Sequence, residues 1–382
     1  MDLNLTDEQE MILQGVREFA RGEIAPRARE MDAEAYIPSA VIEQMRALGL
    51  FGAQIPEAYG GLGLDTVTYS AIIEELARAC AGVSILLSVH ASVAAYPLMV
   101  FAGEEQRRRF LPRLAAGEIG AFCLSEPGSG SDAASLKTSA RRDGDGYVLN
   151  GAKVFVSSGS LASLYLVMAR SDPQADPPHR GISAFLVERE AAGIVIGRKE
   201  DKMGLRADDT MEVFFEDCRV PAANRIGEEG AGFKIAMKSL DSGRIGVGAQ
   251  AIGIAQAACD AALAYARERQ QFGRPLAHFQ AIQNKLADMA VQIEAARLLV
   301  HQAAWLKDRG RSYTKQAAMA KLFASEMSTR VAHQALQIHG GYGYMKDYAV
   351  ERYYRDARVT EIYEGTSEMQ RLVIARQVLR GE

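Results

Sequence analysis

The sequence predicts an α+β fold in three parts: an N-terminal helical domain (residues 1–118), a middle antiparallel β-barrel-like domain (119–230) and a C-terminal four-helix bundle (231–382). Two observations support this order. Apolar residues recur at helical spacing in the first part, give way to short β-rich segments, and return to helical spacing in the last. The 382 residues, 48% of them hydrophobic, are also enough to bury a large core.

The first domain opens with an amphipathic helix that begins after Thr6. Thr6 and Gln9 have the spacing of a capping box, and apolar residues follow three and four positions apart. Further helical segments are bounded by Gly, Pro, Asp or Ser, and they cover residues 37–50, 65–80, 84–103 and 104–117. The first domain is therefore predicted to be helical throughout.

The middle domain consists of short segments rich in Val, Ile, Phe and Tyr that turn clusters such as RRDGDG and DPQADPP separate. These segments are residues 120–127, 147–158, 163–171, 181–190, 193–199 and 210–220. After them the helical period returns near 234–268, 275–308 and 313–339, in segments long enough for a bundle.

Charge and cysteine usage narrow the class of protein. A net charge of −4 offers no broad basic field for nucleic acid. The four cysteines lack metal-ligand spacing, which predicts reduced thiols and no metal site. The N-terminus MDLNLTDEQE resembles neither a signal nor a transit peptide, and the longest apolar run, ILLSV, is too short for a membrane span. We expect a cytoplasmic protein of bacterial type without membrane partners.

One loop, SEPGSGSD at 125–132, contains a partial match to a dinucleotide-binding fingerprint. The string GSGSDA at 128–133 fits the relaxed pattern G-x-G-x-x-G/A, but the polar, β-leaning sequence after it cannot open the helix that this mechanism needs. We therefore reject a Rossmann fold. The glycines and serines of the loop could approach a polar ligand, and an ordinary β-turn is the simpler alternative.

Four separated stretches together resemble the acyl-CoA dehydrogenase family: FCLSEPGSGSD from 122, ERQQFGRPLAHFQAIQ from 268, QIHGGYGY from 337 and IYEGTSEMQR from 362. The resemblance covers essentially the whole chain and is closest to the short-chain (butyryl-CoA) branch. It implies a homotetramer with one FAD per subunit, bound between the β domain and the bundle and partly against a neighbouring subunit. Electrons would pass to an electron-transfer flavoprotein.

The resemblance implies that Glu364 is the catalytic base. Desaturation of an acyl-CoA to the trans-2-enoyl-CoA requires removal of an α-proton while a β-hydride leaves for flavin N5. Glu364 would remove that proton, whereas YEG in isolation suggests a surface glutamate that caps the last helix. Some branches carry the base immediately before the arginine that is Arg244 here, and this chain has Gly243 at that place.

The resemblance also assigns binding residues, position by position. The cofactor-binding set is Phe122, Leu124, Ser125, Ser131, Phe155, Ser157, Arg269, Phe272, Gln280, Gln337, Gly340, Gly341, Thr366 and Glu368. The substrate-binding set is Ser131, Asp241, Arg244, Gln250, Thr360 and Gly365. The chain departs from the family at Phe155, where tryptophan is common, and at Asp208 or Asp209, where a serine is frequent at a contact on the CoA side.

The sequence leaves alternatives open for the acyl chain of the substrate and for the electron acceptor. Gln250 and Thr360 resemble the pair that shortens the acyl pocket in the short-chain branch, so a butyryl-like substrate is favoured and branched short chains stay open. An acyl-CoA oxidase that uses dioxygen would share nearly all of these residues. A non-catalytic binding protein of the same fold, such as the DNA-binding alkylation-response branch, would need a basic surface and a longer C-terminus.

Overall fold

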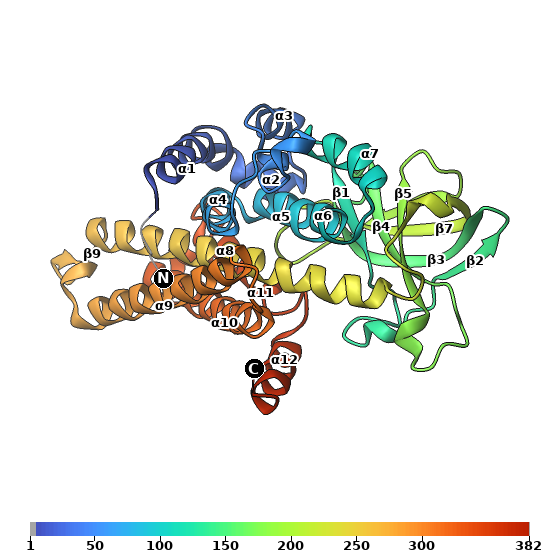
Figure 1. Ribbon diagram of the computed structural model, residues 1–382. Helices are drawn as coiled ribbons and strands as arrows, with labels where there is room; N and C mark the ends of the chain where they lie inside the picture. Colours follow the sequence, from blue (N-terminus) through green and yellow to red (C-terminus); the bar gives the residue numbers. More distant parts are fainter. Residues whose placement is uncertain (1–4, 382) are drawn as a thin grey trace.

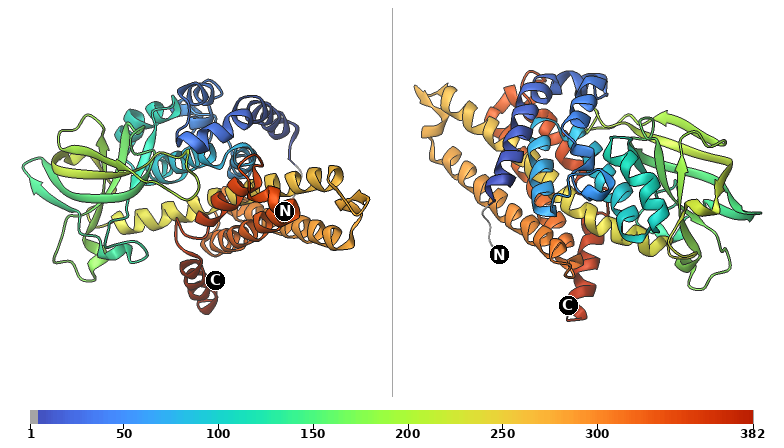
Figure 2. Two further views of the ribbon diagram at one scale, coloured as in Figure 1. Left: turned by 180° about the vertical axis from the view of Figure 1, so that it is seen from behind. Right: turned by 45° about the horizontal axis from the view of Figure 1, so that its top comes forward.

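A computed structural model describes residues 5–381. Helices of the N-terminal part lie along one side of a bundle of long helices, and a β-sheet domain occupies one end of the molecule (Figures 1 and 2). The N-terminal helices are α1 Asp7–Phe19, α2 Ala28–Glu34, α3 Ser39–Ala47, α4 Thr66–Ala79, α5 Ala81–Val89, α6 Tyr96–Phe101 and α7 Glu104–Ala115. The predicted capping box is confirmed, because Thr6 Oγ1 accepts from the Gln9 N–H and Gln9 Oε1 accepts from the Thr6 N–H.

A buried histidine joins the helical domain to the sheet. His90 begins a π-helical stretch, His90–Ala95, between α5 and α6. Its Nδ1 accepts from the Gly120 N–H at 3.1 Å, and its Nε2 donates to the Phe51 carbonyl at 3.1 Å. Burial lowers the pKa of His90 to about 4, so the ring is neutral and one tautomer satisfies both contacts.

The sheet is mixed, which corrects the antiparallel prediction. Its strands are β1 Gly120–Cys123, β2 Ser139–Asp143, β3 Gly146–Ser157, β4 Leu164–Arg170, β5 Ile182–Glu188, β6 Ile194–Lys199, β7 Thr210–Pro221 and β8 Arg225–Ile226. Most neighbours pair antiparallel, but β4 pairs parallel with β1 and, through Ser139 and Arg170, with β2. Turn clusters reveal hairpins between consecutive strands, whereas the long connection from β1 to β4 has no such signature.

Strand β4 is buried on both faces. Leu164, Leu166 and Met168 pack in one hydrophobic cluster with residues of α6, α7 and the start of α8, while Tyr165 and Val167 point into the main core. This alternation is the period-two pattern of a strand between two apolar layers. The loop 125–132 leads into the three-residue 3₁₀ turn Ala133–Ser135 and then into β2, which agrees with the rejection of a Rossmann fold.

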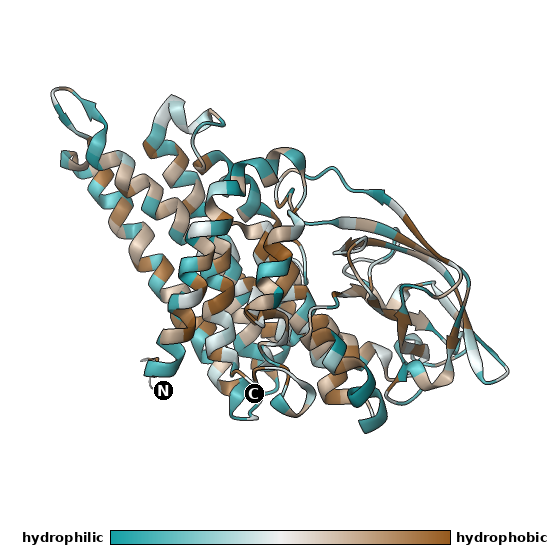
Figure 3. Cartoon of the chain, turned by 90° about the horizontal axis from the view of Figure 1, so that it is seen from above, coloured by the Kyte–Doolittle hydropathy of each residue, from teal (hydrophilic) through white to brown (hydrophobic). Residues whose placement is uncertain are grey.

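The C-terminal part contains α8 Gly232–Glu268, α9 Gln280–Asp308, α10 Thr314–His339, α11 Val350–Val359 and α12 Ser367–Leu379. The second long helix begins at residue 280 and not near 275, because a small hairpin, β9 Gln270–Gln271 and β10 Arg274–Pro275, and a 3₁₀ turn intervene. This hairpin projects from the far end of α8 and is hydrophilic, whereas apolar positions line the helices where they meet (Figure 3). Helix α8 spans about 55 Å at 1.5 Å per residue.

Two helical stretches, Ala81–Phe101 and Gly232–Glu268, are long and apolar enough to cross a membrane by length and composition alone. However, 83% and 67% of their most apolar windows are buried in the fold. These windows therefore form the core of the folded chain. All four cysteines are unpaired, and three of them are buried, as the sequence predicts.

Candidate active site

Glu364 lies in the turn between α11 and α12. Its backbone has a φ of 50°, and Gly365 follows with a φ of 94°. The left-handed conformation is unfavourable for a non-glycine residue and is retained where surrounding contacts hold it. Thr366 then caps α12, since its Oγ1 accepts from the Met369 N–H. The turn directs the Glu364 carboxylate into the protein.

The Glu364 carboxylate is buried although the residue as a whole is partly exposed. Neither carboxylate oxygen has a hydrogen-bond partner within residues 5–381. Burial raises the pKa of Glu364 to about 7, against the opposing charges of Lys321 and Arg244. A carboxyl group that titrates near pH 7 and has free oxygens is suited to accept a proton from a weak carbon acid.

Gly243 on α8 lies directly beneath this carboxylate. A Cβ atom at position 243 would lie 2.0 Å from Glu364 Oε2, so the contact requires glycine. Next to it, the buried Arg244 donates from Nη1 to Asp241 Oδ1 at 2.6 Å, and Thr314 donates to Asp241 Oδ2 at 2.6 Å. The structure thus brings Asp241 and Arg244 together with Glu364.

Gln250 and Thr360 are both fully buried near the same turn. Gln250 Nε2 donates to the Ala81 carbonyl at 2.9 Å and to Ser84 Oγ at 3.0 Å, and Gln250 Oε1 accepts from the Tyr363 hydroxyl. Gln250 therefore ties α8 to α5 and to the residue before Glu364. The Thr360 hydroxyl donates to the Ala357 carbonyl within its own helix end, at 2.7 Å.

A second group of predicted residues lies on the β domain. Phe122, Leu124 and Ser125 are partly buried at the end of β1, and Ser131 is exposed on the loop after it. Phe155 on β3 is 68% exposed and has a φ of 58°, next to a register shift between β3 and β7. A large aromatic ring held open in this way offers a flat apolar platform beside the hydroxyl of Ser157.

A buried ion pair shapes this surface. Lys153 Nζ donates to Glu126 Oε1 at 2.8 Å and to the Leu124 carbonyl at 3.0 Å, which fastens the loop after β1 onto β3. Glu126 also accepts from the Lys137 and Thr138 N–H groups, so all of its oxygens are satisfied. Removal of either partner would leave a buried charge uncompensated.

Asp208, one of the two positions where the chain departs from the family, lies behind the β-domain surface. Asp208 is buried, and its Oδ2 accepts from Ser157 Oγ at 3.0 Å and from Thr210 Oγ1 at 2.6 Å. Burial raises the pKa of Asp208. The carboxyl group therefore supports Ser157 on the β-domain surface.

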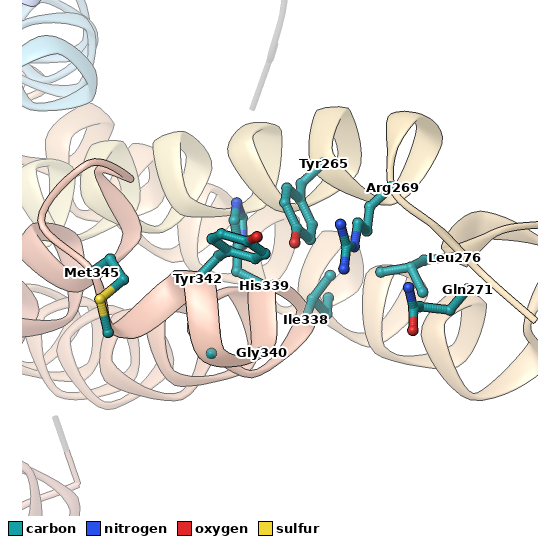
Figure 4. Close-up of a pocket in the computed structure, with 10 residues that line it drawn as sticks. Tyr265, Arg269, Gln271, Leu276, Ile338, His339, Gly340, Tyr342 and Met345 are labelled. Atoms are coloured by element: carbon teal, nitrogen blue, oxygen red, sulfur yellow. The ribbon is translucent and has the colours of Figure 1, made fainter.

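A third group of predicted residues lies at the far end of the bundle, around a pocket of about 500 Å³ (Figure 4). Arg269, Gly340 and Gly341 line it with Tyr265 and Tyr342. The remaining members of this group, Phe272, Gln280 and Gln337, are exposed nearby, and Phe272 at the tip of the hairpin is 93% exposed. Arginine and closely approached glycine backbone are suited to bind phosphate.

The β-domain surface and the Arg269 pocket lie apart along α8. Ser157 bonds Asp208, which adjoins Gly82 at the start of α5, and Gln250 in the middle of α8 bonds the neighbouring Ala81 carbonyl. The pocket lies at the C-terminal end of α8, where the hairpin β9–β10 projects (Figure 1). Gln250 and Arg269 are 19 residues apart, which is about 28 Å of helix at 1.5 Å per residue, so the two groups are well separated on one chain. Each group by itself fits one portion of FAD: the aromatic platform with hydroxyls suits a flat ring system, and the arginine pocket suits a pyrophosphate. Thr366 and Glu368 lie with Glu364, at the start of α12.

A helical domain, a mixed sheet and a helical bundle form a three-part α+β protein, and the turn before α12 places the Glu364 carboxylate, whose pKa burial raises, in its interior. Profiles of the N-terminal, middle and C-terminal domains of acyl-CoA dehydrogenase match residues 6–118, 121–218 and 230–379. The chain belongs to the acyl-CoA dehydrogenase family, and it is an oxidoreductase of a family that is generally FAD-dependent.

Full-length relatives agree with this assignment. An acyl-CoA dehydrogenase of Bacillus subtilis (strain 168) is 50% identical over 380 residues, which cover 99% of this chain and 100% of that protein. The mitochondrial short-chain specific acyl-CoA dehydrogenase of Mus musculus is 48% identical and covers 99% of this chain, with 92% of its own length matched. The structure of butyryl-CoA dehydrogenase from Megasphaera elsdenii has a TM-score of 0.97 at 46% identity, over 100% of both chains.

Sequence reasoning missed several residues that build the site. Lys321 and Gln370 contact the backbone of the Glu364 turn, Tyr363 holds Gln250, and Glu126 pairs with Lys153. A signal for Lys321 was present: the buried face of α10 contains Ala317, Ala324 and Ser328, and Lys321 lies on the same helical stripe. A charged residue on a buried stripe requires a partner.

Proposed function

We propose that this chain desaturates a short-chain acyl-CoA to the trans-2-enoyl-CoA, with Glu364 as the base that removes the α-proton. The observation that carries the proposal is the Glu364 carboxylate, which is buried, lacks hydrogen-bond partners and lies directly over Gly243. Other branches of the family carry their base at the position of residue 243, so a base at either position would lie at the same place in the fold. This chain has glycine at 243, and Glu364 is therefore the proposed proton acceptor.

FAD, when bound, supplies the acceptor for the hydride that leaves the β-carbon. The residues of the chain perform the remaining tasks. Glu364 holds the proton after transfer, and the apolar acyl group excludes water from its carboxylate, which favours the neutral form of the acid. Phe122, Leu124, Ser125, Phe155 and Ser157 would bind the ring portion of FAD, and Arg269, Phe272, Gly340 and Gly341 would bind its other end.

The substrate is proposed to be butyryl-like. Gln250 lies about 10 Å along α8 from Gly243, at 1.5 Å per residue, so its buried amide can close an acyl pocket soon after the reacting carbons. The bonds of Gln250 to α5 and to Tyr363 hold it at that place. The similarity to the short-chain specific enzyme of mouse and to butyryl-CoA dehydrogenase supports the same chain length.

We further propose a homotetramer in which FAD contacts the β-domain surface of one subunit and the Arg269 pocket of another, and the separation of the two groups along α8 supports this arrangement. Two electrons must leave the reduced flavin after each turnover, and an electron-transfer flavoprotein in the cytoplasm is the proposed acceptor. An oxidase would instead pass them to dioxygen.

The proposal is tested by the visible spectrum of the purified protein. The parent protein should contain oxidised FAD that butyryl-CoA bleaches without oxygen, faster than octanoyl-CoA does. Glu364→Gln should retain FAD and bind butyryl-CoA yet bleach about 10² to 10⁴ times more slowly, the usual contribution of a positioned base. Bleaching of the variant at the parent rate would remove Glu364 from its role, and rapid reoxidation by air would favour the oxidase.

A further inference from the structure

Lys321 is a fully buried lysine in the N-terminal third of α10. Its ammonium group donates to the carbonyl of Gly365 at 2.7 Å, in the turn that carries Glu364. Within the described chain it has no carboxylate at ion-pair distance. Because a buried ammonium group is costly to desolvate, its retention at this place requires an explanation.

The first consequence of this contact concerns the shape of the turn. Gly365 O receives a second hydrogen bond from Gln370 Nε2 at 2.8 Å, and Gln370 also donates to Glu364 O at 3.3 Å. These donors hold Glu364 and Gly365 in their left-handed conformations, with φ of 50° and 94°. That backbone geometry is what places the carboxylate over Gly243.

The second consequence concerns charge. Four elements face the Glu364 carboxylate: α4 through the neutral Tyr69 hydroxyl, α8 through Arg244, α10 through Lys321, and the turn itself through Tyr363. The Arg244 charge is largely compensated, because its Nη1 pairs with Asp241 at 2.6 Å. Lys321 donates to a neutral carbonyl oxygen, and burial lowers its pKa to about 8, so it is charged at pH 7. Of the carboxylates that act on it, Glu364 has a larger effect than Glu361 and Glu368.

We propose that Lys321 is the positioning residue of the base: its ammonium group holds the turn through Gly365, and its charge favours the ionised form of Glu364 in a buried site. This inference rests on the proposed role of Glu364 as the base. Lys321 would thus have two effects, a hydrogen bond that holds the turn and a charge that acts on Glu364. Different substitutions can test the two effects separately.

The variants are chosen to separate charge from hydrogen bonding. Lys321→Met removes both, Lys321→Gln removes the charge but keeps an N–H donor, and Gln370→Met removes the other donor to Gly365 while the charge stays. Without the charge, the pKa of Glu364 rises, so more of the base is protonated at pH 7. An opposite charge at close range typically lowers a carboxyl pKa by about 1 to 3, which sets the size of the expected shift.

The probe is 3-thiabutyryl-CoA, which has an acidic α-proton but no β-hydrogen to give to the flavin. Proton loss from its complex with the oxidised holoenzyme produces long-wavelength absorbance, and the pH midpoint of that band is the measurement. Loss of a proton makes the site more negative, so removal of a nearby cation must raise the midpoint. We expect a rise of at least about one pH unit in Lys321→Met and Lys321→Gln.

Gln370→Met is the matched control, and its midpoint should stay within a few tenths of a pH unit of the parent value although its turnover falls. Equal midpoints in the parent and both Lys321 variants would overturn the inference and leave Lys321 a structural contact. A shift in Gln370→Met as large as that in Lys321→Gln would also overturn it, since geometry would then explain the shift. A parent that neither forms the band nor is reduced by butyryl-CoA contradicts the proposed function itself.

Discussion

At the scale of single residues, the Glu364 carboxylate destabilises the fold whenever it is ionised. The pKa of this group rises from 4.5 to about 7 on folding because of burial. A raised carboxyl pKa means that the folded state binds the proton more tightly than the unfolded state, so stability falls as pH increases through this range. Above pH 7 the cost is about 3 kcal/mol by this linkage.

Glu364→Gln should therefore stabilise the protein at pH 8 and change its stability little at pH 4.5, where the carboxyl group is neutral in the folded state. Thermal unfolding of the FAD-loaded parent and variant at both pH values measures the difference. Glu105→Gln, at an exposed position on α7, controls for the general loss of one negative charge. An equal Tm of parent and Glu364→Gln at pH 8 would contradict the assigned burial cost.

At the scale of elements, Gln250 connects α5, α8 and the turn before α12 through three hydrogen bonds. Two variants distinguish the effect of the size of the Gln250 side chain from the effect of its hydrogen bond to Tyr363. Gln250→Ala opens space at the end of the pocket, and we expect the chain-length optimum of kcat/KM to move upward. Tyr363→Phe removes the hydroxyl bond without opening space, so kcat should fall with the optimum unchanged.

The measurement is kcat/KM for butyryl-, hexanoyl- and octanoyl-CoA. One methylene in an apolar pocket is worth about 1 to 3 kcal/mol, so the preference should change by degrees along the series. If Gln250→Ala keeps the parent order of substrates, Gln250 does not form the end of the pocket. A change of order in Tyr363→Phe would show instead that the turn sets the chain length.

The same elements show what the sequence can and cannot predict. Periods of 3.6 and 2 residues identify the long helices and most strands, because burial of one face depends only on local spacing. The parallel pairing of β1 with β4 depends on a distant partner and leaves no local pattern. The IYEGT motif points to Glu364. The buried stripe of α10 marks Lys321 as a charge that needs a partner, but the sequence does not identify that partner, because Lys321 and Gln370 bond backbone carbonyls.

At the scale of the whole molecule, the two groups of expected FAD contacts are separated along α8: one lies beside its middle, near Gln250, and the other at its C-terminal end (Figure 1). We predict that a variant altered in one group and a variant altered in the other restore FAD binding when they assemble together. Arg269→Ala and Phe155→Asp should each lower the flavin content of a homogeneous oligomer. In a mixed oligomer some sites combine the intact β-domain surface of one variant with the intact arginine pocket of the other, so flavin content should recover.

Differently tagged variants, produced together and purified through both tags, supply the mixed oligomer. Flavin absorbance per chain is compared with that of each variant alone and with a mixture of the two prepared after purification. No recovery in the co-produced sample would mean that both groups act on the same chain or that one of them does not bind FAD. Phe272→Ala provides a second variant of the arginine end, since its ring is exposed at the hairpin tip.

The separation of the two groups along α8 would also make the fraction of chains that hold FAD depend on the protein concentration. When two chains must associate to complete one site, the fraction of sites that retain FAD depends on the concentration of the chain as well as on that of the cofactor. Dilution would then release flavin even with the free cofactor held constant, and added FAD would favour assembly in return. Scarce or newly synthesised chains would remain colourless until they found a second copy.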